Sequence, residues 1–286
     1  MLAGLIGLLA LAVAPVAAAQ IAARPGDEVF LISTRHLPSC PVADVAGRVS
    51  VIRLDGRTTP GVAPAAELFA GAGGRRTIVH VDGNRVSYQD SVNYGCRMYR
   101  ALTESPNAPP FRLVIWSWPA DEIRGPLRDV QVKADRADVE GTFLGQVLPR
   151  LDQGGGLSLS CFSFGARIVA GGLARSPRPA QVAMLSAAID RDRLCPTGLD
   201  GRAIGPGVNV LNFFNSQDSA LRHYRLLGRD GGGAAGYEGW PCCGTCGGTV
   251  TQYDAACHVG RTHSLSNYLD APSLRASLRQ HLLPTP

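Results

Sequence analysis

Leu157 to Gly165 reads LSLSCFSFG, an apolar strand that runs into Ser163 and then into a helix. In a sharp strand-to-helix turn, the serine hydroxyl stands out of the sheet and the next amide points toward the same space. The turn leaves room only for small residues two positions before and two positions after the serine. Gly165 meets this condition, and Cys161 stands where the first glycine is usual. The stretch therefore predicts an incomplete G-x-S-x-G turn, with Ser163 as the candidate nucleophile.

Strand and helix signals alternate on both sides of this turn. Strands are expected at Glu28–Thr34, Arg48–Leu54, Thr77–Val81, Phe111–Trp118, Gly156–Cys161, Gln181–Ala187, Val208–Phe214 and Ala255–Val259. Helices are expected at Ser87–Leu102, Val130–Leu151, Ala166–Ala174, Ser219–Leu227 and Ser273–Leu283. This order predicts one α/β domain over residues 20–286, with a mainly parallel sheet and helices on both faces. The connection from Asp190 to Gly207 is too short for a large cap domain, so the Gly- and Cys-rich excursion 228–251 is the candidate lid.

Composition excludes several classes of protein. The chain has 286 residues, of which 45% are hydrophobic and 18% charged, which argues against wholesale disorder and against a coiled coil. The net charge of +5 comes mainly from scattered arginines, and Lys133 is the only lysine. Because no dense basic run would follow a phosphate backbone, we expect no nucleic-acid partner.

The first 19 residues have the form of a targeting segment. They carry no charge, Leu2 to Val13 is almost wholly apolar, and Ala17-Ala18-Ala19 precedes Gln20. This pattern predicts a signal peptide cleaved near Ala19 and a secreted or periplasmic protein with no stable membrane span after cleavage. No basic residue precedes the apolar run, which leaves an uncleaved anchor, or a start codon placed too late, as the alternative.

Export gives the eight cysteines a meaning. Outside the cytosol, disulfide bonds are expected among Cys40, Cys96, Cys195, Cys242, Cys243, Cys246 and Cys257, with a connectivity that the sequence leaves open. Cys243-Gly-Thr-Cys246 also has metal-ligand spacing, but a second closely spaced pair is missing. Structural disulfides are therefore the prediction, no metal site is assigned, and zinc or redox chemistry is the minor alternative.

A serine hydroxyl needs a base and a third group that orients the base. Asp218 follows the strand Val208–Phe214, and His263 follows the expected strand Ala255–Val259. The order Ser, Asp, His along the chain is the one that a strand-to-helix serine turn uses, and the three side chains would meet at the carboxyl edge of the sheet.

The acid and the base each have alternatives. Asp218 is also a plausible helix N-cap, and Asp190, which follows another strand, is the reserve acid. His258 falls inside the expected last strand and is interpreted as a packed side chain. The remaining histidines have no comparable placement; they are His36, His80, His223 and His281.

Two amide donors are needed for the oxyanion of an acyl transfer. One is expected from Phe164, directly after the nucleophile. The other is expected from Asn84, where Gly83 lets the backbone approach closely after the strand Thr77–Val81. An ordinary Asp-Gly turn is the alternative for this loop. Trp118 is a possible pocket wall or, equally well, core packing.

These residues resemble the α/β-hydrolase superfamily over nearly all of the mature chain. More narrowly, they resemble poorly characterised bacterial members with an H-G-N-R turn, a W-S-W-P segment, an S-F-G-A-R elbow and a C-terminal T-H. The matching segments here are Asp82–Arg85, Trp116–Pro119, Ser163–Arg167 and Thr262–His263. The resemblance implies a serine nucleophile, the triad order given above, and no metal or organic cofactor. Asp82 and Cys161 depart from the histidine and glycine of that pattern.

The sequence thus predicts a secreted serine hydrolase that cleaves a carboxylic ester or a related small acyl compound. The two departures motivate an alternative, a non-catalytic α/β-hydrolase-like binding or structural protein. The two arginines of the Arg124–Arg128 loop either attract an acidic substrate or are simply solvated.

Overall fold

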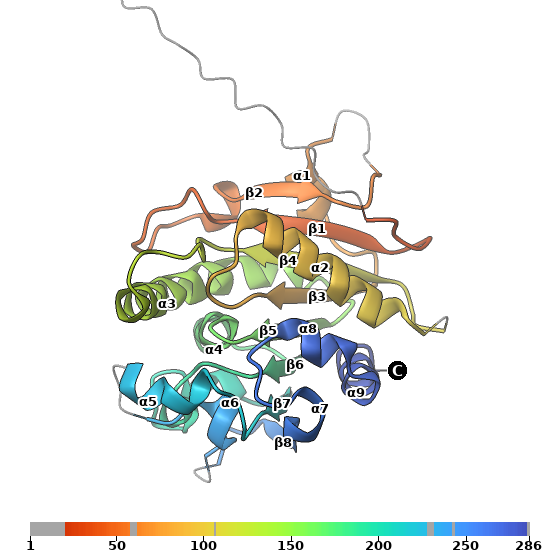
Figure 1. Cartoon of the computed structure of the whole chain (residues 1–286). Helices are drawn as coiled ribbons and strands as arrows, with labels where there is room; N and C mark the ends of the chain where they lie inside the picture. Colours follow the sequence, from red (N-terminus) through yellow and green to blue (C-terminus); the bar gives the residue numbers. More distant parts are fainter. Residues whose placement is uncertain (1–20, 58–61, 106, 228–231, 242–243, 285–286) are drawn as a thin grey trace, which may run out of the picture.

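One mixed sheet organises the chain. The computed structural model describes residues 21–57, 62–105, 107–227, 232–241 and 244–284. The strands are β1 (Glu28–Ser33), β2 (Ser50–Arg53), β3 (Arg76–Val81), β4 (Phe111–Ser117), β5 (Leu157–Phe162), β6 (Ala180–Leu185), β7 (Val208–Phe214) and β8 (Thr249–Asp254). They lie in the order β2-β1-β4-β3-β5-β6-β7-β8, with β2 antiparallel to β1 and the other neighbours parallel (Figure 1). This sheet confirms the predicted α/β-hydrolase-like fold.

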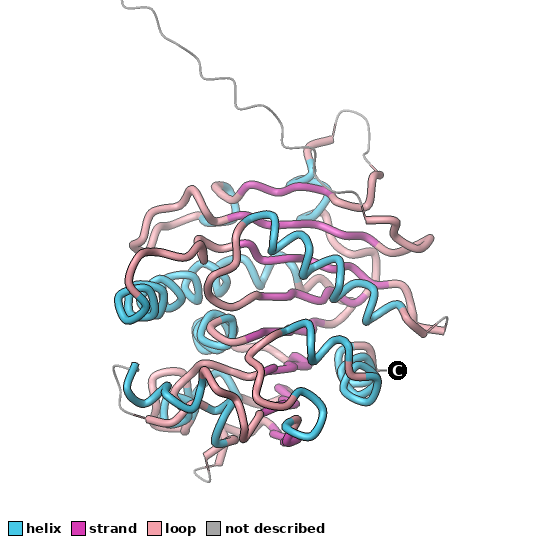
Figure 2. Tube along the Cα trace, in the orientation of Figure 1, coloured by secondary structure: helices cyan, strands magenta, loops and turns pink. Residues whose placement is uncertain are grey.

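Helices fill the connections between the strands, as Figure 2 shows. The α-helices are α1 (Pro64–Phe69), α2 (Tyr88–Thr103), α3 (Pro126–Leu151), α4 (Gly165–Arg175), α5 (Tyr224–Leu227), α6 (Ala235–Glu238), α7 (Ala256–Val259), α8 (Leu265–Asp270) and α9 (Pro272–Leu282). Short 3-10 helices are η1 (Val45–Gly47), η2 (Arg191–Leu194), η3 (Gly201–Ile204) and η4 (Leu221–His223). Only η2 and η3 lie between β6 and β7, in agreement with the expected lack of a large cap there.

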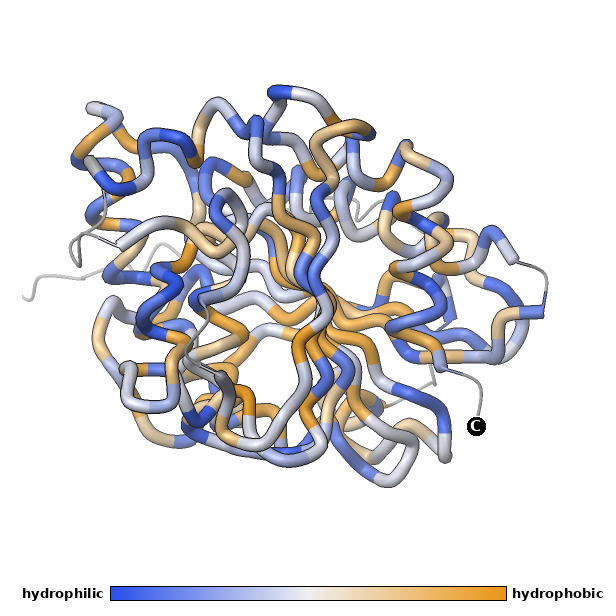
Figure 3. Tube along the Cα trace, turned by 90° about the horizontal axis from the view of Figure 1, so that it is seen from below, coloured by the Kyte–Doolittle hydropathy of each residue, from blue (hydrophilic) through white to orange (hydrophobic). Residues whose placement is uncertain are grey.

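Helices cover both faces of the sheet, and each face has its own core. Figure 1 and Figure 3 show the strands as a central layer between helices. One core cluster joins the sheet to α3 and α4, and includes Leu144, Ile168 and Leu173. The other joins it to α2, α8 and α9, and includes Met98, Tyr268 and Leu278. Continuous burial on both faces explains the nearly unbroken apolar runs of the central strands.

Local sequence signals explain where the two longest helices begin. Ser87 caps α2 in a capping box, in which its hydroxyl accepts from the Asp90 amide and the Asp90 carboxylate accepts from the Ser87 amide. Helix α3 begins at Pro126, directly after Gly125, whose φ is 93°. Proline at the first helical position is pre-organised for a helix, so α3 starts one turn earlier than the expected Val130.

The last strand differs from the prediction. Thr249–Asp254, half of which lies inside the segment expected to be an excursion, forms the edge strand β8, and the expected strand Ala255–Val259 is instead the single helical turn α7. Strand β8 is largely exposed and rich in β-branched residues, so it lacks the apolar signal of the buried strands. His258 consequently lies on the surface, where its Nε2 is 2.7 Å from the Tyr253 hydroxyl, and the prediction that it is packed in a strand is wrong.

The expected signal peptide lies outside the described residues, so export stays a prediction. Within the ranges given above, no helix is long and apolar enough to cross a bilayer.

Candidate active site

Ser163 lies in the turn between β5 and α4 with a backbone φ of 52°. Left-handed φ values are uncommon for residues other than glycine and are found where the surrounding structure enforces them. Here the Ser163 amide donates to the Leu185 carbonyl at 3.1 Å, and the Ser163 carbonyl accepts from the Ala188 amide at 3.0 Å. The end of β6 and the loop after it therefore hold the turn from one side.

Two glycines allow neighbouring segments to touch this turn. A Cβ on Gly165 would lie 2.3 Å from the Val81 carbonyl oxygen, and a Cβ on Gly83 would lie 2.7 Å from the Ser163 Cβ. Neither contact is compatible with a side chain, because backbone or the serine itself occupies the space. The requirement for a small residue two positions after Ser163 therefore comes from the β3 end, which packs against the turn.

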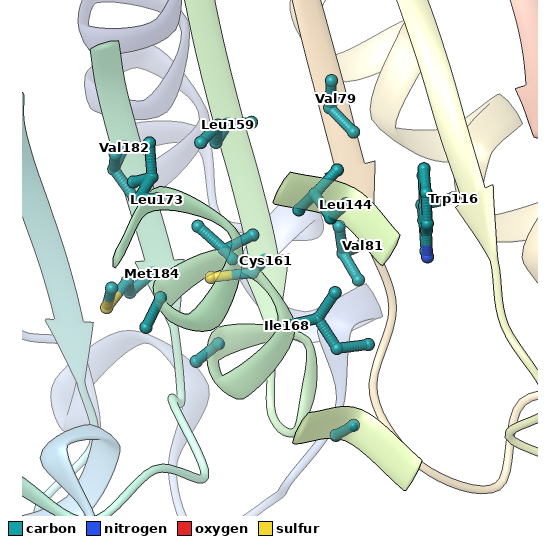
Figure 4. Packing of buried hydrophobic residues seen from close by; sticks show 14 of the residues in the cluster. Val79, Val81, Trp116, Leu144, Leu159, Cys161, Ile168, Leu173, Val182 and Met184 are labelled. Atoms are coloured by element: carbon teal, nitrogen blue, oxygen red, sulfur yellow. The ribbon is translucent and has the colours of Figure 1, made fainter. Parts of the chain in front are cut away.

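Cys161 fits the turn without distorting it. Its side chain points into the α4 side of the core, near Ile168 and Met184 (Figure 4). Its Sγ lies 3.7 Å from the Ala183 carbonyl oxygen of β6. Burial raises the pKa of this thiol well above its ordinary value, so it stays protonated and behaves as a small apolar side chain.

The structure brings together the three side chains that the sequence singled out. The Ser163 hydroxyl is 2.9 Å from His263 Nε2, and His263 Nδ1 is 2.7 Å from Asp218 Oδ2. His263 comes from the loop between α7 and α8 rather than from the mouth of the expected strand. Its ring lies against that of Phe162, with centroids 4.9 Å apart. The imidazole therefore lies between the hydroxyl and the carboxylate, in the arrangement that a base and its orienting group require.

Asp218 is fully buried and hydrogen-bonded through both carboxylate oxygens. Oδ1 accepts from the Ala220 and Leu221 amides, each at 2.9 Å, and Oδ2 accepts from His263 and from the Ser186 hydroxyl at 2.5 Å. Burial raises the pKa of Asp218, but the bonds to His263, Ser186 and the Leu221 amide outweigh burial and bring this pKa below its usual value. The side chain thus binds the backbone at the start of η4 through Oδ1 and faces His263 through Oδ2. The N-cap residue of η4 is Ala220, so the interpretation of Asp218 as a helix N-cap is wrong, and its catalytic role stays a prediction.

Asp190, the reserve acid, lies elsewhere. Its Oδ2 is 3.6 Å from Arg167 Nη1 and accepts from the Tyr224 hydroxyl at 3.3 Å. Arg167 belongs to α4 and also bonds Asp138 of α3. Asp190 is therefore part of an ion-pair network with Arg167 rather than the partner of His263.

The two residues expected to supply oxyanion donors face the same cavity as Ser163 and His263. Asn84 and Phe164 both line it. Within the described residues, neither backbone amide donates to a carbonyl. An oxyanion hole needs two such donors beside the nucleophile, and the role of these two amides stays a prediction.

The loop that carries Asn84 is anchored at three points. The Asn84 side-chain amide and the Arg85 guanidinium both donate to Oδ2 of the buried Asp129 of α3, at 2.9 and 2.8 Å. The Trp118 indole donates to the Asp82 carbonyl at 3.0 Å. Asp82 itself turns back onto the sheet, with its carboxylate 3.1 Å from His80 Nε2. The aspartate in place of histidine therefore leaves the loop held in position.

Trp118 contacts this loop from the core. Its side chain is 1% exposed and packs in the cluster on the α3 side of the sheet, and it is not among the residues that line the cavity. Of the two interpretations, core packing is the correct one. The Arg124–Arg128 loop instead contributes Pro126 and Leu127 to the wall, because α3 begins there.

The cavity beside Ser163 has a volume of about 330 Å³ and a mainly apolar lining. Its wall comes from the first turn of α3, the loop after β6, and the η4–α5 segment. The lining residues are Asn84, Arg85, Pro126, Leu127, Val130, Ser163, Phe164, Ala188, Ser219, Ala220, Leu221, His223, Tyr224 and His263. No described residue of the excursion 228–251 is among them, so the expected lid is wrong for that part of the chain. His223, which had no assigned placement, stands on the rim.

Two residues of the site escaped sequence reasoning, Ser186 and Asp129. Ser186 falls inside the expected strand Gln181–Ala187, whereas β6 ends at Leu185, so the strand-end argument that selected Asp218 does not reach Ser186. Asp129 lies in the first turn of α3, where an acidic residue is common because it interacts favourably with the helix dipole. Its position therefore gives no sign of a role in the site.

The cysteines form no metal site in the described residues. Among these, Cys40, Cys96, Cys161, Cys246 and Cys257 are free thiols, whereas Cys195 is disulfide-bonded. Cys242 and Cys243 lie outside the described residues. Over the same ranges, no group of three or more His, Cys, Asp or Glu side chains is placed to hold a metal ion. Disulfide bonding of Cys40, Cys96, Cys246 and Cys257 is therefore not what the structure has.

Of three comparisons with known proteins, one finds matches. No model of a known protein family matches the chain, and a search of curated proteins also finds no match. Among solved structures, it is similar to a propionate-bound thermophilic esterase from the planctomycete Thermogutta terrifontis, at 10% identity and a TM-score of 0.35. The match covers 74% of this chain and 86% of that chain.

Proposed function

We propose that this protein is a serine hydrolase of the α/β-hydrolase type that cleaves a carboxylic ester or a related acyl compound. The observation that carries the proposal is the continuous chain of hydrogen bonds from Ser163 through His263 to the buried Asp218, at 2.9 and 2.7 Å. A hydroxyl, an imidazole and a carboxylate in this order form a nucleophile, a base and an orienting group.

In the first half-reaction, His263 Nε2 takes the proton of the Ser163 hydroxyl as Oγ attacks the acyl carbon. The carbonyl oxygen becomes an oxyanion, and the Phe164 and Asn84 amides donate to it. Asp218 keeps the proton of His263 on Nδ1, which leaves Nε2 free to act as the base. When the tetrahedral intermediate breaks down, His263 gives the proton to the leaving alcohol and an acyl-Ser163 ester remains.

In the second half-reaction, water takes the place of the alcohol. His263 removes a proton from the water, the resulting hydroxide attacks the acyl-Ser163 ester, and the same two amides stabilise the second oxyanion. The proton returns from His263 to Ser163 Oγ, and the carboxylic acid leaves.

The cavity favours an apolar substrate of modest size. About 330 Å³ lies near the lower end of the range for small-molecule sites, and Leu127, Leu221 and Ala188 give its wall apolar character. The Arg85 guanidinium at the rim is already bonded to Asp129. These features favour a short acyl chain over a bulky or strongly acidic one.

A fluorophosphonate probe tests the proposal directly, because it reacts with activated serines. Wild-type protein is expected to be labelled on Ser163, and Ser163→Ala is expected to lose the label while keeping its thermal midpoint. Ser216→Ala, which removes an exposed hydroxyl bonded to Asp254, is the matched control and keeps the label. Full labelling of Ser163→Ala would falsify the proposal.

The same assay decides the alternative, a non-catalytic binding or structural protein. That alternative predicts folded wild-type protein without labelling and without turnover of p-nitrophenyl esters of any chain length. The packing of Cys161 in the core and the anchoring of the Asp82 loop support activity despite these departures.

We further propose that the protein is exported, with cleavage before Gln20. The support is the uncharged, apolar form of residues 1–19. Protein recovered from the periplasm or the medium is expected to start at Gln20 by intact mass, whereas an uncleaved anchor would leave Met1 in place and the protein in the membrane fraction.

A further inference from the structure

Ser186 lies at the end of β6 in a conformation that serine rarely adopts. Its φ is 47°, and its side chain is fully buried. Glycine would take up this backbone without strain. What serine adds over glycine at this position is its hydroxyl, and strained residues of this kind cluster where the side chain has a function.

The hydroxyl meets the far end of the hydrogen-bond chain. Ser186 Oγ donates to Asp218 Oδ2 at 2.5 Å, and the same Oγ is 3.3 Å from His263 Nδ1. Because Asp218 Oδ1 is held by the Ala220 and Leu221 amides, the Ser186 hydroxyl is the second donor, beside His263, that fixes Oδ2. A hydrogen bond to an ionised group is among the stronger ones in a protein.

We propose that Ser186 is a positioning residue that holds Asp218 Oδ2 in line with the Nδ1 proton of His263. This inference rests on the proposed function. The Ser186 side chain is not among the residues that line the cavity, and its hydroxyl contacts Asp218 Oδ2 and His263 Nδ1. It therefore acts through the contact between the acid and the base rather than on the substrate. By keeping the carboxylate ionised and oriented, it fixes the tautomer that lets Nε2 accept the proton of Ser163.

Two substitutions remove the hydroxyl but differ in backbone strain. Ser186→Ala keeps the strain, and Ser186→Gly relieves it. Both are expected to lower kcat for a p-nitrophenyl ester roughly 10- to 100-fold with little change in KM, since the lost bond is one to a charged group. The glycine variant is expected to have the higher thermal midpoint of the two and yet the same low kcat.

A merely structural role gives a different result, in which kcat follows stability and the glycine variant recovers toward wild type. Asp44→Gly is the control, because it also relieves the strain of a left-handed backbone. Asp44 has a φ of 51° and is exposed. It is expected to leave kcat and KM unchanged.

A double-mutant cycle tests whether Ser186 acts through Asp218. In an Asp218→Asn background, Ser186→Ala is expected to change kcat less than about twofold, because effects on one shared unit are not additive. Multiplication of the two single losses, a rise in KM with normal kcat, or a Ser186→Ala enzyme within twofold of wild type would each overturn the assignment. Failure of the proposed function shows separately, as persistent labelling of Ser163→Ala.

Discussion

Asp218 and Asp190 occupy equivalent positions after neighbouring strands of the sheet, but they have different hydrogen-bond partners. Each follows a parallel strand at the carboxyl edge of the sheet, each is fully buried, and each precedes a 3-10 helix. Asp218 faces an imidazole, whereas Asp190 faces the guanidinium of Arg167 and the hydroxyl of Tyr224. Position at a strand end is therefore insufficient to identify a catalytic acid.

The loop beside each carboxylate decides the partner. The segment after β7 is tied to the His263 loop, because Asn215 Nδ2 donates to the Gly260 carbonyl at 2.8 Å and the Ser219 amide donates to the Arg261 carbonyl at 3.1 Å. The segment after β6 is tied instead to the backbone just before α6, through the Arg191 amide and the Gly233 carbonyl. The chain that returns past β8 thus brings histidine to one acid only.

Replacing Asp218 is expected to give the largest effect. Asp218→Asn keeps the shape but removes the charge and the acceptor that select the His263 tautomer, so kcat is expected to fall roughly 10⁴-fold. Steady-state kinetics with a p-nitrophenyl ester measure the loss, and circular dichroism checks the fold. A loss below tenfold would contradict the role of Asp218.

Replacing Asp190 is expected to lower stability and to leave activity almost unchanged. Asp190→Asn leaves Arg167 buried with part of its compensation lost, which should reduce the free energy of unfolding by roughly 3 kcal/mol. Activity below the melting range is expected to stay within about threefold of wild type. Urea denaturation and the same ester assay measure the two quantities. If kcat instead fell as far as in Asp218→Asn, the division between the two acids would be wrong.

The stability of wild type and of Asp218→Asn is expected to depend differently on pH in the acid range, and this effect is smaller than the two above. The pKa of Asp218 is lower in the folded protein than in the unfolded chain, so its ionised form stabilises the fold above the ordinary aspartate range near pH 4. This contribution is lost as the pH falls through the lower folded pKa. Relative to the asparagine variant, wild type is expected to lose about 1.4 kcal/mol of stability for each unit by which the pKa is lowered.

Urea denaturation from pH 7 to pH 2 measures this difference. Ser163→Ala, which retains Asp218, serves as the control and should follow wild type. Parallel curves for wild type and Asp218→Asn would show that the carboxylate contributes nothing in this pH range.

Removing the Tyr224 hydroxyl is expected to have the smallest effect. Tyr224 lines the cavity and bonds Arg167 at 3.2 Å and Asp190 at 3.3 Å. Tyr224→Phe keeps the wall and loses one hydroxyl, so stability should fall by about 1 kcal/mol and KM should change no more than about threefold. A fall in kcat beyond tenfold would show that the Asp190 network takes part in catalysis, and it would contradict the division of roles between Asp218 and Asp190.

The sequence was sufficient for the features that depend on local geometry. A strand that runs into Ser163 and then into a helix dictates a raised hydroxyl, and chain order then placed Asp218 and His263 among the candidates. The final strand was not predictable in the same way, because an exposed edge strand buries little and leaves no apolar signal. The prediction places His263 just past a strand at Ala255–Val259, which is instead the helical turn α7, although His263 is the residue that meets Ser163.

The cavity wall was harder to predict, for a physical reason. It is formed where the start of α3 and the η4–α5 segment meet above the sheet, and these residues are far apart in sequence. Gly125-Pro126 was a readable helix start, but no local pattern says which loop a helix start will face. Ser186 was missed because a serine that ends a strand is unremarkable until its left-handed backbone and its two partners are known.

The close packing of Gly83 and Gly165 around the nucleophile divides the molecule into a part that tolerates no added atoms and a part that does. Leu127, at the mouth of the cavity, is 60% exposed, so its replacement would disturb little of the interior. An engineer seeking a new substrate range would therefore randomise Leu127 and leave the elbow untouched, because Leu127 lines the cavity without packing against the nucleophile.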